Sequence, residues 1–295
     1  MRRVLAPLLS MFMTAAERES PPSPARADIG RSPFVRLREL LGDSQPGKPA
    51  ISLAVGEPQH AVPAFVGPIL AAHIDEFGRY PMNKGIDALC EAAADWLGRR
   101  FVLPRALDPV QEILVLNGSR EGLFLAAIAA AGFVGGRRGR PAMLIPNPFY
   151  AAYAAGDRRF LSHFLELRNV AAPQVPIPTQ RVAVAAYRDE AHVEENRRLY
   201  AQKFDLADQI IGDRYGYRRP AGGFFLWLDV SEQGGDEAAT LRLWREAGLR
   251  VIPGRYLARD QADGSNPGLG YIRVAMVQDQ ETTAQALHRL VAVLG

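Results

Sequence analysis

EILVLNGSREGLFLAAIAAAGFV, residues 112–134, joins a run of apolar residues to an apolar helical pattern, with only a glycine and a serine between them. The part up to Gly118 predicts a buried strand, and the part from Ser119 onward predicts a helix that the chain enters directly from that strand. Backbone N–H groups in the first turn of a helix lack intrahelical partners, and the helix dipole favours negative charge there. This order predicts a phosphate site, with an ordinary N-cap at Ser119 as the alternative.

A second apolar run, PAMLIPNP at residues 141–148, predicts another buried strand. Together with the preceding strand and helix, it indicates a parallel α/β layer, in which ligands bind at the carboxyl ends of the strands. The loops at 117–120 and 147–153 follow such ends, so we expect both to face a ligand. The next predicted helix, 158–169, follows only a glycine and an aspartate, which makes this connection unusually short for an α/β layer.

The remaining segments predict scaffold. Toward the N-terminus we expect a short helix at 32–43, a strand and loop at 51–63 and a helix at 85–101. A long charged helix at 186–211 leads into a segment with a different order of strands and helices. There we expect strands at 222–230, 248–254 and 270–277 and helices at 236–248 and 281–294, which is the pattern of an α+β domain.

Composition bounds the function. The chain has 295 residues, 48% hydrophobic and 23% charged, which suggests about two domains at roughly 150 residues each. The net charge is only +3, and the arginine pairs are scattered among acids, so we expect a solvated surface and no nucleic-acid partner. No apolar run reaches the ~20 residues that span a bilayer, so we expect no membrane segment.

Side chains with their own chemistry are few. Cys90 is the single cysteine and lies in an Ala-rich helical pattern, where we expect it to act as a small core hydrophobe. The five histidines show no metal-ligand spacing. The first 16 residues resemble a weak signal peptide, but a disordered extension or a misplaced start explains them as well. We expect residues 1–30 to be a disordered extension.

The order of several segments, taken together, is similar to that of a known family. Collinear along the chain are AVGEP (54–58), YPMNKGIDALCEAAADWL (80–97), VLNGSREGL (115–123), PNPFYAAY (146–153), PAGGFFLWLD (220–229), GLRVIPGRYL (248–257) and YIRVA (271–275). They resemble the class I/II aminotransferases, which are pyridoxal-phosphate (PLP) enzymes of fold type I. Within that family, the chain is most similar to succinyldiaminopimelate transaminase-like proteins.

The resemblance implies an α/β fold: a three-layer αβα large domain, truncated here, with an α+β small domain. The implied boundaries are 31–168 for the large domain with its N-terminal arm, 169–203 for a linker helix region and 204–295 for the small domain. It also implies PLP as cofactor, an amino acid and a 2-oxo acid as substrates, a homodimer and a cytoplasmic location. Lysine biosynthesis is the implied context.

The resemblance also assigns roles to single positions. It implies that Gly118, Ser119 and Arg120 hold the cofactor phosphate, which agrees with the helix-terminus argument. Tyr150 would stack on the pyridine ring. Tyr80 would reach the phosphate bound to the neighbouring subunit.

Two further positions are assigned to the substrate. Arg273 would bind the substrate α-carboxylate through two charge-assisted hydrogen bonds, for which a planar guanidinium is suited. Without the family, an exposed arginine on a strand would be the preferred interpretation. Gly56, in the AVGEP loop, is the other implied substrate-binding residue.

The pattern of the family is incomplete between Tyr150 and the helix at 158–169. There such proteins carry a strand with the Asp that pairs with the pyridinium nitrogen, and the lysine that forms the Schiff base. Roughly 100 residues are missing, or about three βαβ units of ~30 residues. The only lysines are Lys48, Lys84 and Lys203, and none follows a predicted strand of the large domain. We therefore expect no catalytic lysine.

Transamination needs the amine of the Schiff-base lysine to hold the cofactor and to move a proton. We therefore expect an aminotransferase-family chain with an internal deletion, weak or lost PLP binding and little or no activity. Two alternatives stay open. One is a non-catalytic module that dimerises, with itself or with an intact paralogue, and the other is an assembly or gene-model artefact.

Overall fold

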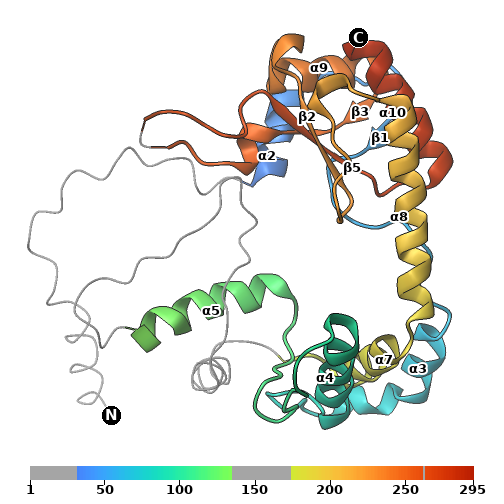
Figure 1. The fold of residues 1–295 in the computed structure, drawn as a ribbon, viewed down its shortest axis with the longest axis vertical. Helices are drawn as coiled ribbons and strands as arrows, with labels where there is room; N and C mark the ends of the chain where they lie inside the picture. The colour runs from blue at the N-terminus through green and yellow to red at the C-terminus, as the bar shows by residue number, and fades with distance from the viewer. Residues whose placement is uncertain (1–31, 135–173, 262) are drawn as a thin grey trace, which may run out of the picture.

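The computed structural model describes residues 32–134, 174–261 and 263–295. The predicted extension at 1–30, the predicted strand at 141–148, Tyr150 and the predicted helix at 158–169 therefore lie outside the described residues. Figure 1 shows two groups of elements joined by the long helix α8 (Ala191–Ile210). One group holds the sheet with its covering helices, and the other is helical.

The sheet group is built around three antiparallel strands in the order β2 (Phe225–Asp229), β5 (Tyr271–Ala275) and β4 (Ile252–Pro253). In β2, Leu226 and Leu228 are fully buried while their neighbours are half-buried, so the strand turns one face to the core, and the strand predicted at 222–230 is confirmed. The helices α9 (Asp236–Ala247) and α10 (Gln280–Leu294) and the C-terminal half of α8 pack on the same core.

A glycine allows the chain to leave α9. Gly248 follows the helix with φ of 68°, and a Cβ there would lie against the backbone of Lys48. Glycine is suited to this left-handed C-terminal position. The chain then enters β3 (Leu249–Arg250), which pairs in parallel with β1 (Ile51–Ser52).

The N-terminal arm belongs to the sheet group. Helix α2 (Pro33–Leu41) begins at the N-cap Ser32 and buries Leu37 and Leu41 against Ile252 and Tyr256. Beyond β1, the backbone N–H of Ala275 donates to the Leu53 carbonyl at 2.8 Å. This bond holds the loop that follows β1 beside the end of β5.

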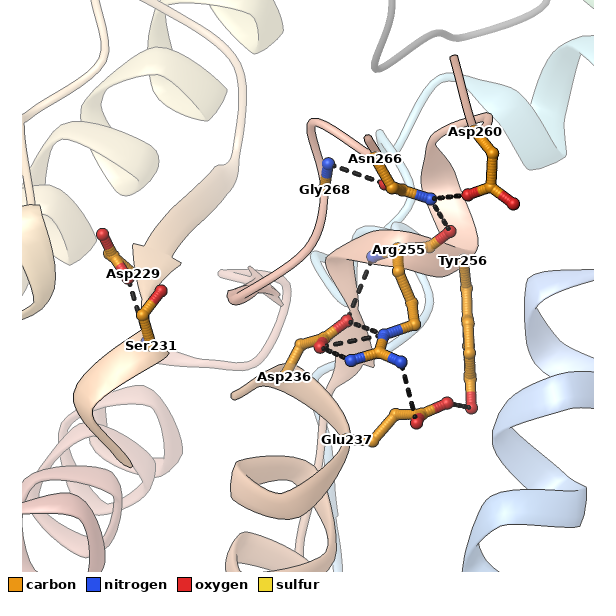
Figure 2. Close-up of polar contacts among 9 residues, drawn as sticks. All are labelled: Asp229, Ser231, Asp236, Glu237, Arg255, Tyr256, Asp260, Asn266 and Gly268. Atoms are coloured by element: carbon orange, nitrogen blue, oxygen red, sulfur yellow. Dashed lines mark hydrogen bonds and ion pairs between the residues drawn. The ribbon is translucent and has the colours of Figure 1, made fainter. Parts of the chain in front are cut away.

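A polar cluster fixes the connection from β4 to β5 (Figure 2). Asp236, fully buried at the start of α9, accepts two hydrogen bonds from Arg255 Nε and one from its terminal nitrogen, at 2.6–3.0 Å. Glu237 accepts from the Tyr256 hydroxyl at 2.6 Å. Asn266, which contacts Asp260, accepts from the Gly268 N–H at 2.9 Å. These contacts set the segment that leads into β5.

The other group is helical. It contains α3 (Val66–Ala72), η1 (Ile74–Gly78), α4 (Asp87–Phe101) and α7 (Ile177–Arg188), and α4 packs on α7 through Leu89, Ala92 and Val184. Helix α5 (Ser119–Val134) stands beside this group in Figure 1. Its Leu125 and Ala129 pack against Leu114 and Leu116. Short 3-10 turns lie at Arg214–Gly216, Ser231–Gln233 and Gly254–Leu257.

Two predicted elements differ from the structure. Residues 112–118 form no strand, although Val115 donates a backbone hydrogen bond to Lys84 at 3.1 Å. A strand needs a partner along its length, and the strand predicted to lie next to it, 141–148, falls outside the described residues. The predicted helix at 186–211 is two helices, because the chain breaks at Asp189, whose carboxylate accepts from the backbone N–H of His192. Among the described helices, none combines the length and apolarity that crossing a membrane requires.

Candidate functional site

Arg273 lies on β5, opposite Trp227 of β2. Its terminal nitrogen donates to the Ala54 carbonyl at 2.6 Å, and its guanidinium carbon lies 4.4 Å from the centre of the Phe225 ring. Its Nε is buried without a hydrogen-bond partner among the described residues. Burial lowers the pKa of this guanidinium from its usual value. Since a buried donor without an acceptor is costly, this side chain has capacity for an added acceptor.

Gly56 lies two residues beyond the carbonyl that Arg273 contacts. A Cβ at this position would sit 2.5 Å from Cζ of Phe225 and 2.9 Å from Cε2 of Phe224. The loop therefore lies directly against these rings, and only a residue without a side chain fits. Gly56 and Arg273, both assigned to the substrate from the sequence, are thus brought together around Phe225.

The ring of Phe225 continues into an aromatic stack. Phe224 lies 4.4 Å from Phe225, and Tyr200 of α8 lies 5.7 Å from Phe224, both measured between ring centroids. Tyr200 contacts His60 at a centroid distance of 5.0 Å. We call residues 53–60, the loop after β1 that carries Gly56, the substrate loop, because the sequence resemblance assigns Gly56 to the substrate. The Tyr200 hydroxyl is buried without a partner among the described residues, and burial raises its pKa. We call Tyr200, Phe224 and Phe225 the aromatic stack.

Lys203 caps the end of this stack opposite Arg273. Its Nζ lies 4.7 Å from the centre of the Tyr200 ring, within range of a cation–π interaction. The same nitrogen contacts His60 Nε2 at 2.9 Å and the Met276 carbonyl at 3.1 Å. Lys203 is 2% exposed, and burial lowers the pKa of its amine.

The residues assigned to the cofactor phosphate lie elsewhere. Helix α5 begins at Ser119, and Gly118 precedes it with φ of 122°, so the predicted helix entry is present. Both residues are exposed. The Glu121 carboxylate accepts from the Asn117 N–H at 2.9 Å. The Glu121 carboxylate thus accepts a hydrogen bond from a backbone N–H just before the helix, as in a capping box. Its negative charge would oppose a phosphate at the same turn.

The remaining assignments are placed only in part. Arg120 lies in the first turn of α5. Tyr80 is 98% exposed, and Tyr150 lies outside the described residues. No described contact joins the start of α5 to the cluster around Arg273, so the structure brings together the two substrate residues but not the cofactor residues with them.

The fit to PLP is therefore partial. Gly118 and Ser119 offer a helix start suited to phosphate, but each lysine lies elsewhere. Lys48 is exposed before β1, Lys84 lies in the turn before α4, and Lys203 is buried within α8. None of the three follows a described strand. Within the described ranges, no group of His, Cys, Asp and Glu residues could hold a metal ion.

A separate hollow of about 530 Å³ lies between α4 and the junction of α7 with α8. Trp96 and two glutamates line it together with Arg99, Arg100, Arg188 and Arg197. Three of these arginines occupy the last turns of α4 and α7, where they complement the helix dipoles, and Arg197 pairs with Glu194. These interactions account for the positions of the four arginines without a bound ligand.

Sequence reasoning missed the aromatic stack and the contacts of His60, which it noted only as a histidine without metal-ligand spacing. The signal was weak. Phe224 and Phe225 stand in an alternating strand pattern, and Tyr200 and Lys203 stand in a charged helix, so neither pattern marks a site. Only the spacing of Tyr200 and Lys203, three residues apart on one helix face, indicates that they meet.

Comparisons with known proteins agree on one family. The family model described as aminotransferase class I and II matches residues 149–290. The transaminase OxyQ of Streptomyces rimosus, named for 4-dedimethylamino-4-oxo-anhydrotetracycline, is 24% identical over 343 residues, covering 81% of this chain and 92% of the relative. An LL-diaminopimelate aminotransferase of Desulforudis audaxviator is 35% identical over 130 residues, covering 42% of this chain.

The chain spans only 30% of the length of that second relative. Among solved structures, an aminotransferase of Neisseria meningitidis matches with a TM-score of 0.81 and 26% identity, covering 90% of this chain and 98% of the other. The fold is therefore that of the fold-type I PLP enzymes, as the sequence predicted, in a form consistent with truncation. The family model covers just under half of the chain, and these comparisons show what the chain is similar to, namely the class I and II aminotransferases.

Proposed function

We propose that this chain descends from an enzyme that moves amino groups between amino acids and 2-oxo acids, and that it keeps the carboxylate-binding part of the site with little or no transaminase activity. The observation that carries the proposal is the pair of Arg273 and Gly56 around Phe225, with Nε of Arg273 buried and unpartnered. A carboxylate would supply the missing acceptor and neutralise a buried charge.

The residues of this chain would divide the work as follows. Arg273 binds the carboxylate, the Ala54 carbonyl and the Phe225 ring hold the guanidinium in place, and Gly56 leaves room beside the ring. Gly118, Ser119 and Arg120 would hold the cofactor phosphate, with Tyr150 against its ring. Pyridoxal phosphate, when bound, supplies the electron sink for amino-group transfer.

The proposed lack of activity rests on an internal deletion, which is part of the same proposal. The match to OxyQ runs over 343 residues, whereas 81% of a 295-residue chain is about 239 residues. The difference of about 100 alignment positions supports a deletion of the size expected from the sequence. Without a lysine in the catalytic position, no amine holds the cofactor or moves the proton.

The finer assignments belong to the same proposal. The succinyldiaminopimelate-like motifs, and a relative named LL-diaminopimelate aminotransferase, support a diaminopimelate-type amino acid as the ligand. We extend the proposal to a homodimer in the cytoplasm. Tyr80, 98% exposed, is available to a second subunit.

A second candidate function is a non-catalytic module that pairs with itself or with an intact paralogue. Two observations favour this function. The sheet group has a continuous core, and the residues close to Tyr80 in sequence include exposed apolar side chains, namely Ile74, Phe77 and Met82. Co-purification with such a paralogue would support this function, whereas a strictly monomeric, aggregation-prone chain would count against it.

Two measurements test the main proposal. With added PLP, an amino acid and a 2-oxo acid, purified protein should transfer amino groups no faster than PLP alone does. Saturable amino-group transfer would refute the proposed lack of activity. Amino acid binding, measured by calorimetry, should be lost in Arg273→Gln and kept in Arg198→Gln, which alters a surface arginine paired with Glu195. Equal binding by both variants would remove Arg273 from the site.

A different explanation of the short connection is an error in assembly or gene prediction. Re-sequencing across codons 150–165 decides it. If re-sequencing recovers about 100 further codons, including one for a lysine, the short connection is an error, and the protein would be expected to be an active enzyme.

A further inference from the structure

We propose that Lys203 is a positioning residue of the carboxylate site, which it serves from the far end of the aromatic stack. The inference rests on the proposed function, because it concerns the carboxylate that Arg273 binds. Lys203 itself contacts no part of that site directly. It acts through His60 on the substrate loop and through Tyr200 on the stack.

The first step is the contact between Lys203 and the loop. His60 Nδ1 lies 2.8 Å from the Asn196 side-chain oxygen, which can only accept a hydrogen bond. Nδ1 therefore carries the proton, and Nε2 accepts from Lys203 at 2.9 Å. His60 is thus held from both sides by α8, and the loop that carries Gly56 is fixed four residues away.

The second step is the contact with β5. Lys203 donates to the carbonyl of Met276, three residues beyond Arg273, and the N–H of Met276 donates to the Phe224 carbonyl at 2.8 Å. The N–H of Gln59 donates to the Val277 carbonyl at 3.2 Å. One amine therefore links α8, the end of β5 and the substrate loop.

The third step is the stack itself. Lys203 covers one face of Tyr200, and the rings lead through Phe224 to Phe225, on which Arg273 lies. The stack carries a cation at each end. Within the described residues, no ion pair joins either cation to a carboxylate, and the charge of Asp279 acts on Lys203 only at longer range. The backbone at Gly56 lies so close to both phenylalanine rings that a Cβ there would overlap them. A shift of Tyr200 would therefore pass through the rings to the residues that flank the carboxylate.

A structural role alone would predict lost stability without a specific effect on binding. Lys203→Met keeps an unbranched side chain of similar length but removes both hydrogen bonds and the charge. Lys203→Arg keeps a cation that can donate to His60 and to the Met276 carbonyl. Lys48→Met is the matched control, because Lys48 is exposed and no described side chain contacts it.

The experiment measures amino acid affinity and amide hydrogen exchange in the same folded variants. Lys203→Met should bind about tenfold more weakly than wild type and exchange faster at residues 56–60, while exchange in α4 stays unchanged. Lys203→Arg should recover most of the affinity, and Lys48→Met should match wild type. In an Arg273→Gln background, Lys203→Met should have no further effect on affinity.

Wild-type affinity in Lys203→Met, or unchanged exchange at 56–60, would overturn the inference. If the wild-type chain binds no amino acid, the proposed function fails. Amide hydrogen exchange alone then tests whether Lys203 holds the loop. Faster exchange confined to 56–60 and the end of β5 would keep Lys203 as the residue that holds the loop. Uniformly faster exchange would reduce Lys203 to a core residue.

Discussion

Gly56→Ala offers a direct test of the packing around Arg273. The added Cβ would stand 2.5 Å from Cζ of Phe225 and 2.9 Å from Cε2 of Phe224. Carbon atoms in contact prefer about 3.5–4.0 Å, so the Phe225 ring or the loop must move by about 1 Å. The backbone of Gly56 does not have a positive φ, so the cost is one of space and not of backbone strain.

The magnitude follows from this overlap. Overpacking a close-packed site costs about 1–3 kcal/mol of unfolding free energy. Both rings belong to the aromatic stack, so moving them also displaces the face on which Arg273 rests, at 4.4 Å from the Phe225 centroid. We therefore expect weaker amino acid binding in addition to lower stability.

Chemical denaturation and calorimetric binding measure the two effects. Gly67→Ala is the control, since Gly67 lies within helix α3 and a Cβ there meets nothing within 4 Å. It should leave stability unchanged or raise it by up to about 1 kcal/mol. Equal stability and affinity for Gly56→Ala and Gly67→Ala would refute the close contact between the loop and the stack.

Three further outcomes follow from the structure. Asp236→Asn should lower the unfolding free energy by about 1–3 kcal/mol in denaturant titrations, because it weakens the buried charge-assisted hydrogen bonds to Arg255, which keeps its ion pair with Glu237. A loss under about 0.5 kcal/mol, half of the lower end of that range, would contradict this. The lowered pKa of Lys203 means that the unfolded chain binds more protons between the folded-state pKa and about 10.4, so stability should rise with pH across that window. This rise should be smaller in Lys203→Met, where an unchanged slope would count against the buried amine. Cys90 is 2% exposed and burial raises its pKa, so a thiol reagent should label it only after unfolding, and rapid labelling of the native chain would show otherwise.

The elements of the sheet group were predictable because their patterns are local. The alternation of Leu226 and Leu228, the helix at α9 ending at Gly248, and the strand that carries Arg273 all follow from spacing and turn residues. The entry into α5 at Gly118 and Ser119 was predictable for the same reason.

Residues 112–118 show where local patterns fail. Their apolar run is that of a buried strand, yet the run forms none in the structure, because a strand depends on neighbours that its own sequence does not contain. The break at Asp189 was missed because its carboxylate caps the next helix through a contact that helical periodicity does not reveal.

The candidate site was predictable only where the family supplied roles. Arg273 and Gly56 came from the resemblance, and the structure adds that both lie against the Phe225 ring. Lys203 and His60 could not be predicted, because 143 residues separate them in the sequence.

Borohydride reduction in the presence of PLP, followed by peptide mass spectrometry, tests the central claim most directly. Because none of the three lysines is placed to hold the cofactor, we expect no peptide that contains Lys48, Lys84 or Lys203 to carry a pyridoxyl group at cofactor concentrations near those of the protein. Stoichiometric labelling of a single lysine, together with saturable turnover, would contradict the claim that this chain lacks a catalytic amine.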